Sequence, residues 1–99
     1  MIVIYGQDVE TNNDGSSIET SSDGSVRHYK DGMYHREDGP AVIHADGWMG
    51  WWLNGQHHRE DGPAAIWPNG FQEWWYKGKR LSCQSQEEFE RLLKLKAFW

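Results

Sequence analysis

Two identical heptads carry the side chains of this 99-residue chain that are best suited to chemistry. The letters His-Arg-Glu-Asp-Gly-Pro-Ala occupy residues 35–41 and recur 23 residues later, at residues 58–64. A histidine beside two carboxylates could transfer protons, and the same groups could hold a metal ion. An active site needs one such constellation in one pocket, whereas a motif repeated at a fixed period serves every unit of an array alike. We therefore expect a structural role for the heptads, with no catalytic residue, no metal site and no cofactor.

The arginine of each heptad is expected to pair with an acid. Arg36 and Arg59 should form ion pairs with heptad acids along the ladder of strands. Asp38 and Asp61 should shape the Gly-Pro turns that follow them. The five histidines include no helix-spaced ligand pair with a carboxylate, and the lone cysteine excludes an internal disulfide and a cysteine-based zinc site.

The glycine spacing indicates that the heptads connect units of a repeat array. Glycines recur every 23 residues, at positions 24, 47 and 70 and again at positions 32, 55 and 78, so three units align without a gap. Each unit predicts one β-hairpin. Asp46-Gly47 and Asn69-Gly70 predict two-residue type I′ turns, because Gly and Asn tolerate positive φ. The later glycines should end the second strands and release the chain into the heptads, where proline interrupts strand pairing.

Both ends of the chain depart from the repeat. Residues 1–5 predict a short edge strand, and residues 6–22 are the least regular stretch. Ser85 with Glu88 fits a capping box, and helical spacing of apolar residues predicts an amphipathic helix over residues 85–98. We expect one domain over residues 1–99: an N-terminal strand and loop at 1–16, three hairpin repeats at 17–80, and the helix.

Counting outward from two-residue turns assigns each strand residue to a face of the sheet. The expected core face holds Ile18, Tyr29, Ala41, Ile43, Trp48, Trp52, Ala64, Ile66, Phe71 and Trp75. The expected opposite face holds Glu19, Val26, His28, Lys30, Val42, His44, Met49, Trp51, Leu53, Ala65, Trp67, Gln72, Trp74 and Tyr76. Either the helix covers this second face, or the face presents an aromatic surface to a partner.

Composition narrows the classes of partner. The net charge is −5, which argues against a protein that tracks nucleic-acid phosphates and against binding to anionic membranes. The first 24 residues hold five acids and no base. The chain shows no signal peptide and no membrane-spanning stretch, so we expect a soluble, cytoplasmic protein.

Two stretches of the chain resemble the MORN repeat and its variants: residues 51–58 (Trp-Trp-Leu-Asn-Gly-Gln-His-His) and residues 68–75 (Pro-Asn-Gly-Phe-Gln-Glu-Trp-Trp). The resemblance extends over residues 17–80, and the chain departs from the usual pattern at residues 59–63. It implies a mainly β fold: tandem antiparallel β-hairpins in a single-layer twisted sheet, here followed by one C-terminal α-helix. Arrays of this kind are associated with protein contacts, dimerisation and sometimes membrane lipids. The heptad version is similar to small phage and bacterial accessory proteins.

The leading hypothesis is a non-catalytic protein-binding module, encoded by a phage or mobile element, that inhibits a host protein by occupying it, as an anti-defence or anti-CRISPR-like factor does. Tryptophan and tyrosine are enriched in binding hot spots. The expected binding residues are Trp51, Trp67, Trp74, Tyr76, His44, Met49 and His28. The repeat frame is assigned to Arg36, Asp38, Arg59, Asp61, Gly47 and Gly70. An exposed edge strand would allow a homodimer.

Three alternatives stay open. The indoles could stack on a nucleotide base while Arg36, Arg59 or Arg80 contacts its phosphate. The protein could be an antitoxin-like MORN variant. The acidic first 24 residues could mimic nucleic acid toward a basic partner.

Overall fold

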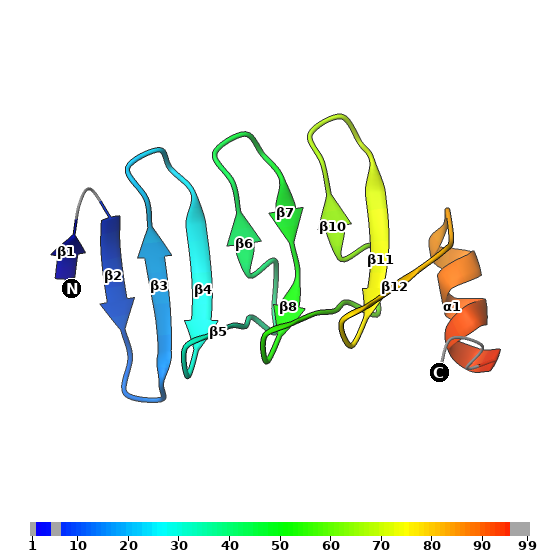
Figure 1. The fold of residues 1–99 in the computed structure, drawn as a ribbon, viewed down its shortest axis with the longest axis horizontal. Helices are drawn as coiled ribbons and strands as arrows, with labels where there is room; N and C mark the ends of the chain where they lie inside the picture. Colours follow the sequence, from blue (N-terminus) through cyan, green and yellow to red (C-terminus); the bar gives the residue numbers. More distant parts are fainter. Residues whose placement is uncertain (1, 5–6, 96–99) are drawn as a thin grey trace.

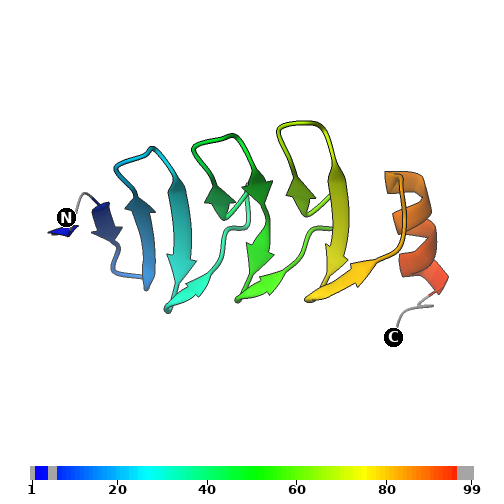
Figure 2. The ribbon, with the colours of Figure 1, turned by 45° about the horizontal axis from the view of Figure 1, so that its top comes forward.

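The structure is a computed structural model that describes residues 2–4 and 7–95. Antiparallel strands lie side by side in near-sequence order, and a single described helix stands at the C-terminal end (Figures 1 and 2). The extents of 46 × 31 × 17 Å fit one layer of sheet with side chains on both faces. The fold is therefore mainly β with a C-terminal helix, as the sequence predicts.

Every repeat contributes two hairpins, a tall one and a short one (Figure 1). The strands and helix are β1 (Ile2–Ile4), β2 (Gln7–Thr11), β3 (Ser16–Thr20), β4 (Val26–Lys30), β5 (Met33–Tyr34), β6 (Val42–Ile43), β7 (Met49–Gly50), β8 (Trp52–Leu53), β9 (Gln56–His57), β10 (Ala65–Ile66), β11 (Gln72–Tyr76), β12 (Lys79–Leu81) and α1 (Gln86–Leu95). The tall hairpins are β3–β4, β6–β7 and β10–β11. The short hairpins are β4–β5, β8–β9 and β11–β12.

The tall hairpins do not have the predicted type I′ turns. Gly47 and Gly70 have φ of 100° and 90°, but neither Asp46 nor Asn69 has positive φ. The backbone of Gly47 donates to the carbonyl of His44 at 2.9 Å, as in a type I turn followed by a left-handed glycine. The Asp46 and Asn69 side chains instead accept from the amide two residues later, at 2.9 and 3.0 Å. These loops therefore hold three residues rather than two.

The type I′ geometry belongs to the short hairpins. Both central residues have positive φ, 51° and 79° at Asn54 and Gly55, and 49° and 80° at Lys77 and Gly78. Asp31-Gly32 repeats the pattern in the first unit. The second glycine of each unit thus makes a tight hairpin. It does not simply end a strand.

The extra turn residue shifts the register of every first strand by one position. Ile43 pairs with Met49, and Val42 pairs with Gly50. A two-residue turn would have shifted both pairs, and a slip of one residue exchanges the two faces of a strand. The predicted grouping of side chains into two faces is therefore correct for the second strands. The side chains of the first strands lie on the face opposite to the predicted one.

With this register, the two faces differ sharply in composition. The ring face holds Tyr29, Tyr34, His44, Trp48, Trp52, His57, Trp67, Phe71 and Trp75. The heptad face holds His28, Met49, Trp51, Gln72, Trp74 and Tyr76, together with the heptad loops that leave the sheet between units.

The buried core agrees with the prediction at Ala41 and Ala64, which are fully buried, and otherwise lies elsewhere. Its apolar members are Ala41, Val42, Ala64, Ala65, Trp74, Leu81 and Phe89. Trp74 was expected on an outward binding face and is only 3% exposed, because α1 packs Phe89 against it and Leu81. Phe71 was expected in the core and is 52% exposed, because no described element covers its end of the ring face.

The N-terminal region is more regular than predicted. Within the stretch 6–22, β2 and β3 pair as a hairpin whose turn contains Gly15 at φ 88°. β1 pairs with β2, in agreement with the expected edge strand, while residues 1, 5 and 6 lie outside the described residues.

The helix is confirmed over Gln86–Leu95, and residues 96–99 of the predicted span lie outside the described residues. Ser85 accepts from the Glu88 amide at 3.2 Å and caps the helix as predicted. Glu88 accepts from the Gln84 amide, one residue before the cap, at 2.7 Å. Among the described residues, no helix has the length and apolarity needed to cross a membrane.

Candidate functional site

The two heptads form the same closed loop. Arg36 donates to the Asp38 carboxylate at 3.0 Å and to the Pro40 carbonyl at 3.2 Å. Arg59 makes the corresponding bonds to Asp61 at 2.9 Å and to the Pro63 carbonyl at 3.1 Å. The arginine–acid pairing is therefore confirmed, within each heptad rather than between units.

The glycine of each heptad makes room for this arginine. A Cβ on Gly39 would lie 3.0 Å from the Arg36 guanidinium carbon, and a Cβ on Gly62 would lie 2.6 Å from that of Arg59. Because both distances are shorter than normal carbon contacts, a side chain would push the guanidinium away from its partners. The Gly-Pro step therefore serves the loop closure as well as the interruption of strand pairing.

The heptad histidines connect neighbouring units. His35 Nδ1 accepts from the Asn54 amide and His58 Nδ1 accepts from the Lys77 amide, both at 2.9 Å. These amides start the tight turns of the following unit. An imidazole nitrogen engaged in this way is not available as a general base.

The arginines also set the charge of the exposed heptad acids. The hydrogen bond from Arg36 holds the pKa of Asp38 below its usual value, and the bond from Arg59 does the same for Asp61. Both carboxylates stay ionised across the physiological range. The loops thus carry ionised, salt-bridged acids.

Beneath the heptad lies a position whose residue differs between the three units. In the first unit it is His28, whose Nε2 lies 3.3 Å from Arg36 Nη1. In the second it is Trp51, whose ring lies 4.0 Å below the Arg59 guanidinium. Burial, followed by the nearby Arg36, lowers the pKa of His28. In the third it is Trp74, where Ser82 replaces the arginine and α1 takes the covering position.

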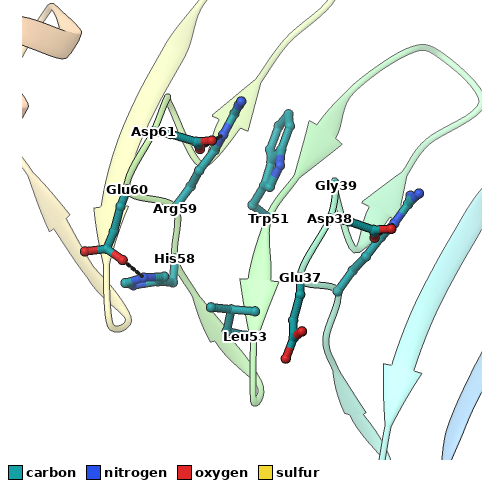
Figure 3. A pocket seen from close by; sticks show the side chains of 10 residues that line it. Glu37, Asp38, Gly39, Trp51, Leu53, His58, Arg59, Glu60 and Asp61 are labelled. Atoms are coloured by element: carbon teal, nitrogen blue, oxygen red, sulfur yellow. Dashed lines mark hydrogen bonds and ion pairs between the residues drawn. The ribbon is translucent and has the colours of Figure 1, made fainter.

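A groove runs between the two heptads on this face. Figure 3 shows Trp51 standing between Asp38 on one side and the Arg59–Asp61 pair on the other. The groove has a volume of about 660 Å³. Both guanidinium groups already pair with a carboxylate, which offsets part of the positive charge that a ligand phosphate would meet in the groove.

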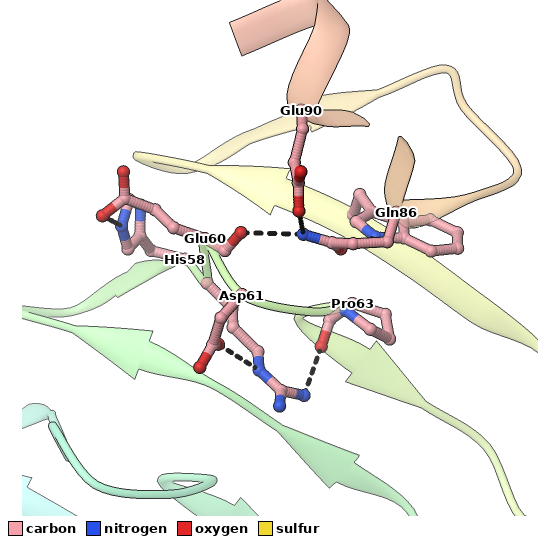
Figure 4. A network of polar contacts seen from close by, with 8 residues as sticks. His58, Glu60, Asp61, Pro63, Gln86 and Glu90 are labelled. Atoms are coloured by element: carbon pink, nitrogen blue, oxygen red, sulfur yellow. Dashed lines mark hydrogen bonds and ion pairs between the residues drawn. The ribbon is translucent and has the colours of Figure 1, made fainter. Parts of the chain in front are cut away.

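Gln86 fastens the helix to the third unit and to the second heptad. Its carbonyl accepts from the Trp74 indole at 2.8 Å, and its amide donates to the Glu60 carbonyl at 2.9 Å. The same amide donates to Glu90 one turn later on the helix (Figure 4). One side chain therefore satisfies the buried indole N–H and joins three elements.

The ring face carries a lower row of stacked rings that crosses all three units. Tyr34 bridges Tyr29 at 5.2 Å and Trp52 at 5.3 Å between ring centroids. His57 bridges Trp52 at 4.2 Å and Trp75 at 4.7 Å. The row thus alternates a ring from the first strand of a short hairpin (Tyr29, Trp52, Trp75) with a ring from its second strand (Tyr34, His57), and each contact crosses between strands.

Burial shifts the pKa of Tyr29 and of His57 in this row. It raises the pKa of Tyr29 to about 12 and lowers the pKa of His57. His57 lies 2.9 Å from the Ala64 carbonyl, to which its Nε2–H donates. These rings are neutral at pH 7 and act as packing surfaces.

An upper row of rings lies near the tips of the tall hairpins. Trp48 contacts His44 at 4.8 Å and Trp67 at 5.9 Å, and Trp67 contacts Phe71 at 5.1 Å. Trp48 also contacts Trp52 of the lower row at 5.9 Å. Gly50 lies beneath both indoles, where a side chain would collide with them. The two rows therefore form one aromatic surface.

The predicted binding residues do not form one site. His44 and Trp67 belong to the ring face, whereas His28, Met49 and Trp51 lie on the heptad face. Trp74 is buried in the cluster with Leu81 and Phe89, and Tyr76 packs against this cluster. The ring centroid of Tyr76 lies 4.8 Å from that of His58. Trp48, Phe71 and Tyr34 were not predicted as binding residues. The acceptor side chains of Asp46 and Asn69 were the sequence signal for the three-residue turns, which place His44 beside Trp48 and Trp67 beside Phe71.

Metal ligands do not converge in the part of the chain that the structure describes, since no group of three or more His, Cys, Asp or Glu side chains is placed to hold an ion. Cys83 is partly buried, and burial raises the pKa of its thiol. No protein-family model, curated protein or solved structure matches this chain.

Proposed function

We propose that the protein is a non-catalytic binding module that holds a protein partner against the ring face. The observation that carries this proposal is the continuous double row of aromatic rings, from Tyr29 to Trp75 and from His44 to Phe71. No described element covers this surface, whereas the opposite face carries the heptads and the helix contacts. Exposed aromatic surface of this extent is typical of protein contacts.

The ring face is suited to recognition because its rings are held in place before binding. Each indole of the upper row contacts at least two other rings, so a partner would order few side chains on contact. Polar pairs border the rings: Arg27 with Glu19 at 3.1 Å, and Arg80 with Glu73 at 3.2 Å. An apolar centre with a polar rim is the usual anatomy of an interface.

The arginines favour protein binding over nucleotide binding. Arg36 and Arg59 close their own heptads, and Arg80 pairs with Glu73. A nucleotide phosphate would have to compete with these carboxylates for the arginine charge. This cost does not apply to a protein that docks on uncharged rings.

The proposal includes a family and a setting. The 23-residue spacing and the recurring order of strands and glycine turns support a MORN-like array. The heptad sequence supports a phage or mobile-element protein that inhibits a host protein in the cytoplasm. Binding by occupation requires only a rigid surface. The array provides such a surface.

Substitution on the ring face tests the proposal. A double variant, His44→Ser with Phe71→Ser, removes two exposed rings from the upper row and should keep the fold. Met33→Ser with Leu95→Ser is the matched control, because these side chains are 45% and 68% exposed and lie off the ring face. Immobilised protein would be exposed to lysate of the source cells, and bound proteins would be quantified by mass spectrometry.

The two variants give opposite expectations. The ring-face variant should lose the partner that the parent retains, while the control should keep it, with circular dichroism unchanged in both. Retention of the partner by the ring-face variant together with its loss by the control would contradict the proposal.

A further inference from the structure

The third unit lacks a neighbour that the first two units have. β4 pairs with β6 through Val26 and Ile43, and β7 pairs with β10 through Met49 and Ile66. In both cases the first strand of the next unit lies along the upper part of a second strand. The upper part of β11 pairs with β10 on its inner side, and no described strand pairs with its outer side.

Gln72 presents backbone groups to this open side. The carbonyls of Phe71 and Glu73 accept from the two residues that flank β10, at 2.9 Å from the Trp67 amide and 2.8 Å from the Ala64 amide. Because backbone groups alternate along a strand, the N–H and C=O of Gln72 point the opposite way. Its counterpart in the second unit, Met49, pairs with Ile66 of the next unit.

A groove occupies the vacant strand position. It has a volume of about 750 Å³, with Phe71, Gln72 and Trp74 along one wall and the segment 82–84 along the other. The helix covers the lower part of β11 through Trp74 and leaves this upper part open.

Phe71 shows independently that a neighbour is missing. Its counterpart Trp48 is half-buried because Trp67 of the next unit packs on it at 5.9 Å. Among residues 2–4 and 7–95, the ring neighbour of Phe71 lies within its own hairpin, and Phe71 is 52% exposed. An incoming strand with an aromatic residue at the position of Trp67 would cover it.

We propose that the outer edge of β11 accepts an extended segment of a partner protein as an added antiparallel strand. The chain specifies the chemistry of this segment, because its own strands fill the equivalent edges with Ala-Val-Ile-His at 41–44 and Ala-Ala-Ile-Trp at 64–67. The segment therefore carries small or β-branched residues followed by an aromatic residue. Main-chain hydrogen bonds to Gln72 supply affinity, and the contact with Phe71 supplies selectivity. This site shares Phe71 with the ring face, but strand addition uses the main chain of Gln72 and does not depend on the ring-face proposal.

The test uses a peptide that copies the natural occupant. The peptide Pro-Ala-Ala-Ile-Trp-Pro, from residues 63–68, would be titrated into uniformly ¹⁵N-labelled full-length protein. Saturable shift changes should centre on the amides of residues 71–73, and the Gln72 amide should gain protection from hydrogen exchange. A peptide of the same composition in scrambled order should leave these amides unchanged. Absence of shifts at residues 71–73, or equal shifts with the scrambled peptide, would overturn the proposal.

A backbone variant tests the added strand itself. Gln72→Pro removes the outward N–H and spares the inner ladder, as proline is tolerated at an edge position. It should weaken peptide binding about tenfold. Gln72→Thr keeps the N–H and should bind like the parent, with tryptophan fluorescence reporting an intact fold in both. Equal binding by the proline variant would contradict strand addition. Shifts at residues 71–73 that appear on concentration without peptide would assign the edge to a second copy and overturn the assignment to a foreign segment.

Discussion

Trp51 and Trp74 occupy the same position of two successive units and have different surroundings. Both lie on the heptad face, one residue before the tryptophan that joins the lower ring row. Trp51 has the Arg59 guanidinium above it and borders an open groove, whereas Trp74 is 3% exposed beneath the helix. The repeat therefore determines where a side chain points. The covering element determines whether that side chain serves stability or contact.

Alanine at each tryptophan gives the largest expected difference. Trp74→Ala should lower the free energy of unfolding by about 3–5 kcal/mol, because it leaves a cavity against Phe89 and Leu81. Trp51→Ala should cost about 1 kcal/mol, because the ring is only partly buried. Urea unfolding followed by circular dichroism measures both. Equal losses would show that the helix does not distinguish the two positions.

Removing the helix contact sharpens the comparison. Gln86→Ala leaves the Trp74 indole N–H without its acceptor and should cost about 1–3 kcal/mol. Glu87→Ala, one residue along the same helix turn, is the control, since its carboxylate is 86% exposed and pairs with Arg91 on the surface. The control should change the unfolding free energy little. A larger loss in the control would mean that the Gln86 bond does not hold the helix.

Alanine substitution of the two heptad arginines should give a smaller difference in unfolding free energy between the first two units. Both lose the same heptad bonds on substitution, but Arg59 also covers an indole while Arg36 contacts His28. Arg59→Ala should therefore cost about 0.5–1 kcal/mol more than Arg36→Ala. A Trp51→Ala background should abolish the excess. A double-mutant cycle of unfolding free energies measures it, and an excess that persists without Trp51 would point to another cause.

Of the changes considered, acidification should lower the free energy of unfolding least. Burial holds the pKa of His57 below its usual 6.5, despite the Ala64 carbonyl and Glu73, which favour the charged form. The unfolded chain therefore takes up this proton at a higher pH than the folded chain, so stability is complete above the usual pKa and falls as pH drops below it. Urea unfolding between about pH 7.5 and about pH 5 should show this loss, and His57→Gln should reduce it. An unchanged slope in the variant would assign the loss to other groups.

The hairpin array and its terminal helix were predictable because glycine spacing and helix capping act locally. The heptad closure was predictable for the same reason, since Arg36 and Asp38 are two residues apart. The three-residue turn was missed because an Asp-Gly pair fits two turn types. The deciding bond, from the Trp48 amide to the Asp46 carboxylate, can form in only one of them.

The assignment of the binding residues failed where long-range packing decides exposure. Nothing near Trp74 in the sequence marks it as buried, because its cover comes from Gln86 and Phe89 after the last turn. A one-residue shift of the first strands likewise moved Trp67 and His44 to the ring face. Local patterns identified the rings but not the surface to which each belongs.

The central claim is that an open ring face and a covered third unit coexist in one array, and the accessibility of individual indoles tests it most directly. The protein would be labelled with 5-fluorotryptophan, its ¹⁹F resonances assigned by single Trp→Phe variants, and a water-soluble paramagnetic agent added. The account predicts strong relaxation at Trp67, weaker relaxation at Trp51 beneath Arg59, and almost none at Trp74. Relaxation of Trp74 as strong as that of Trp67 would contradict it.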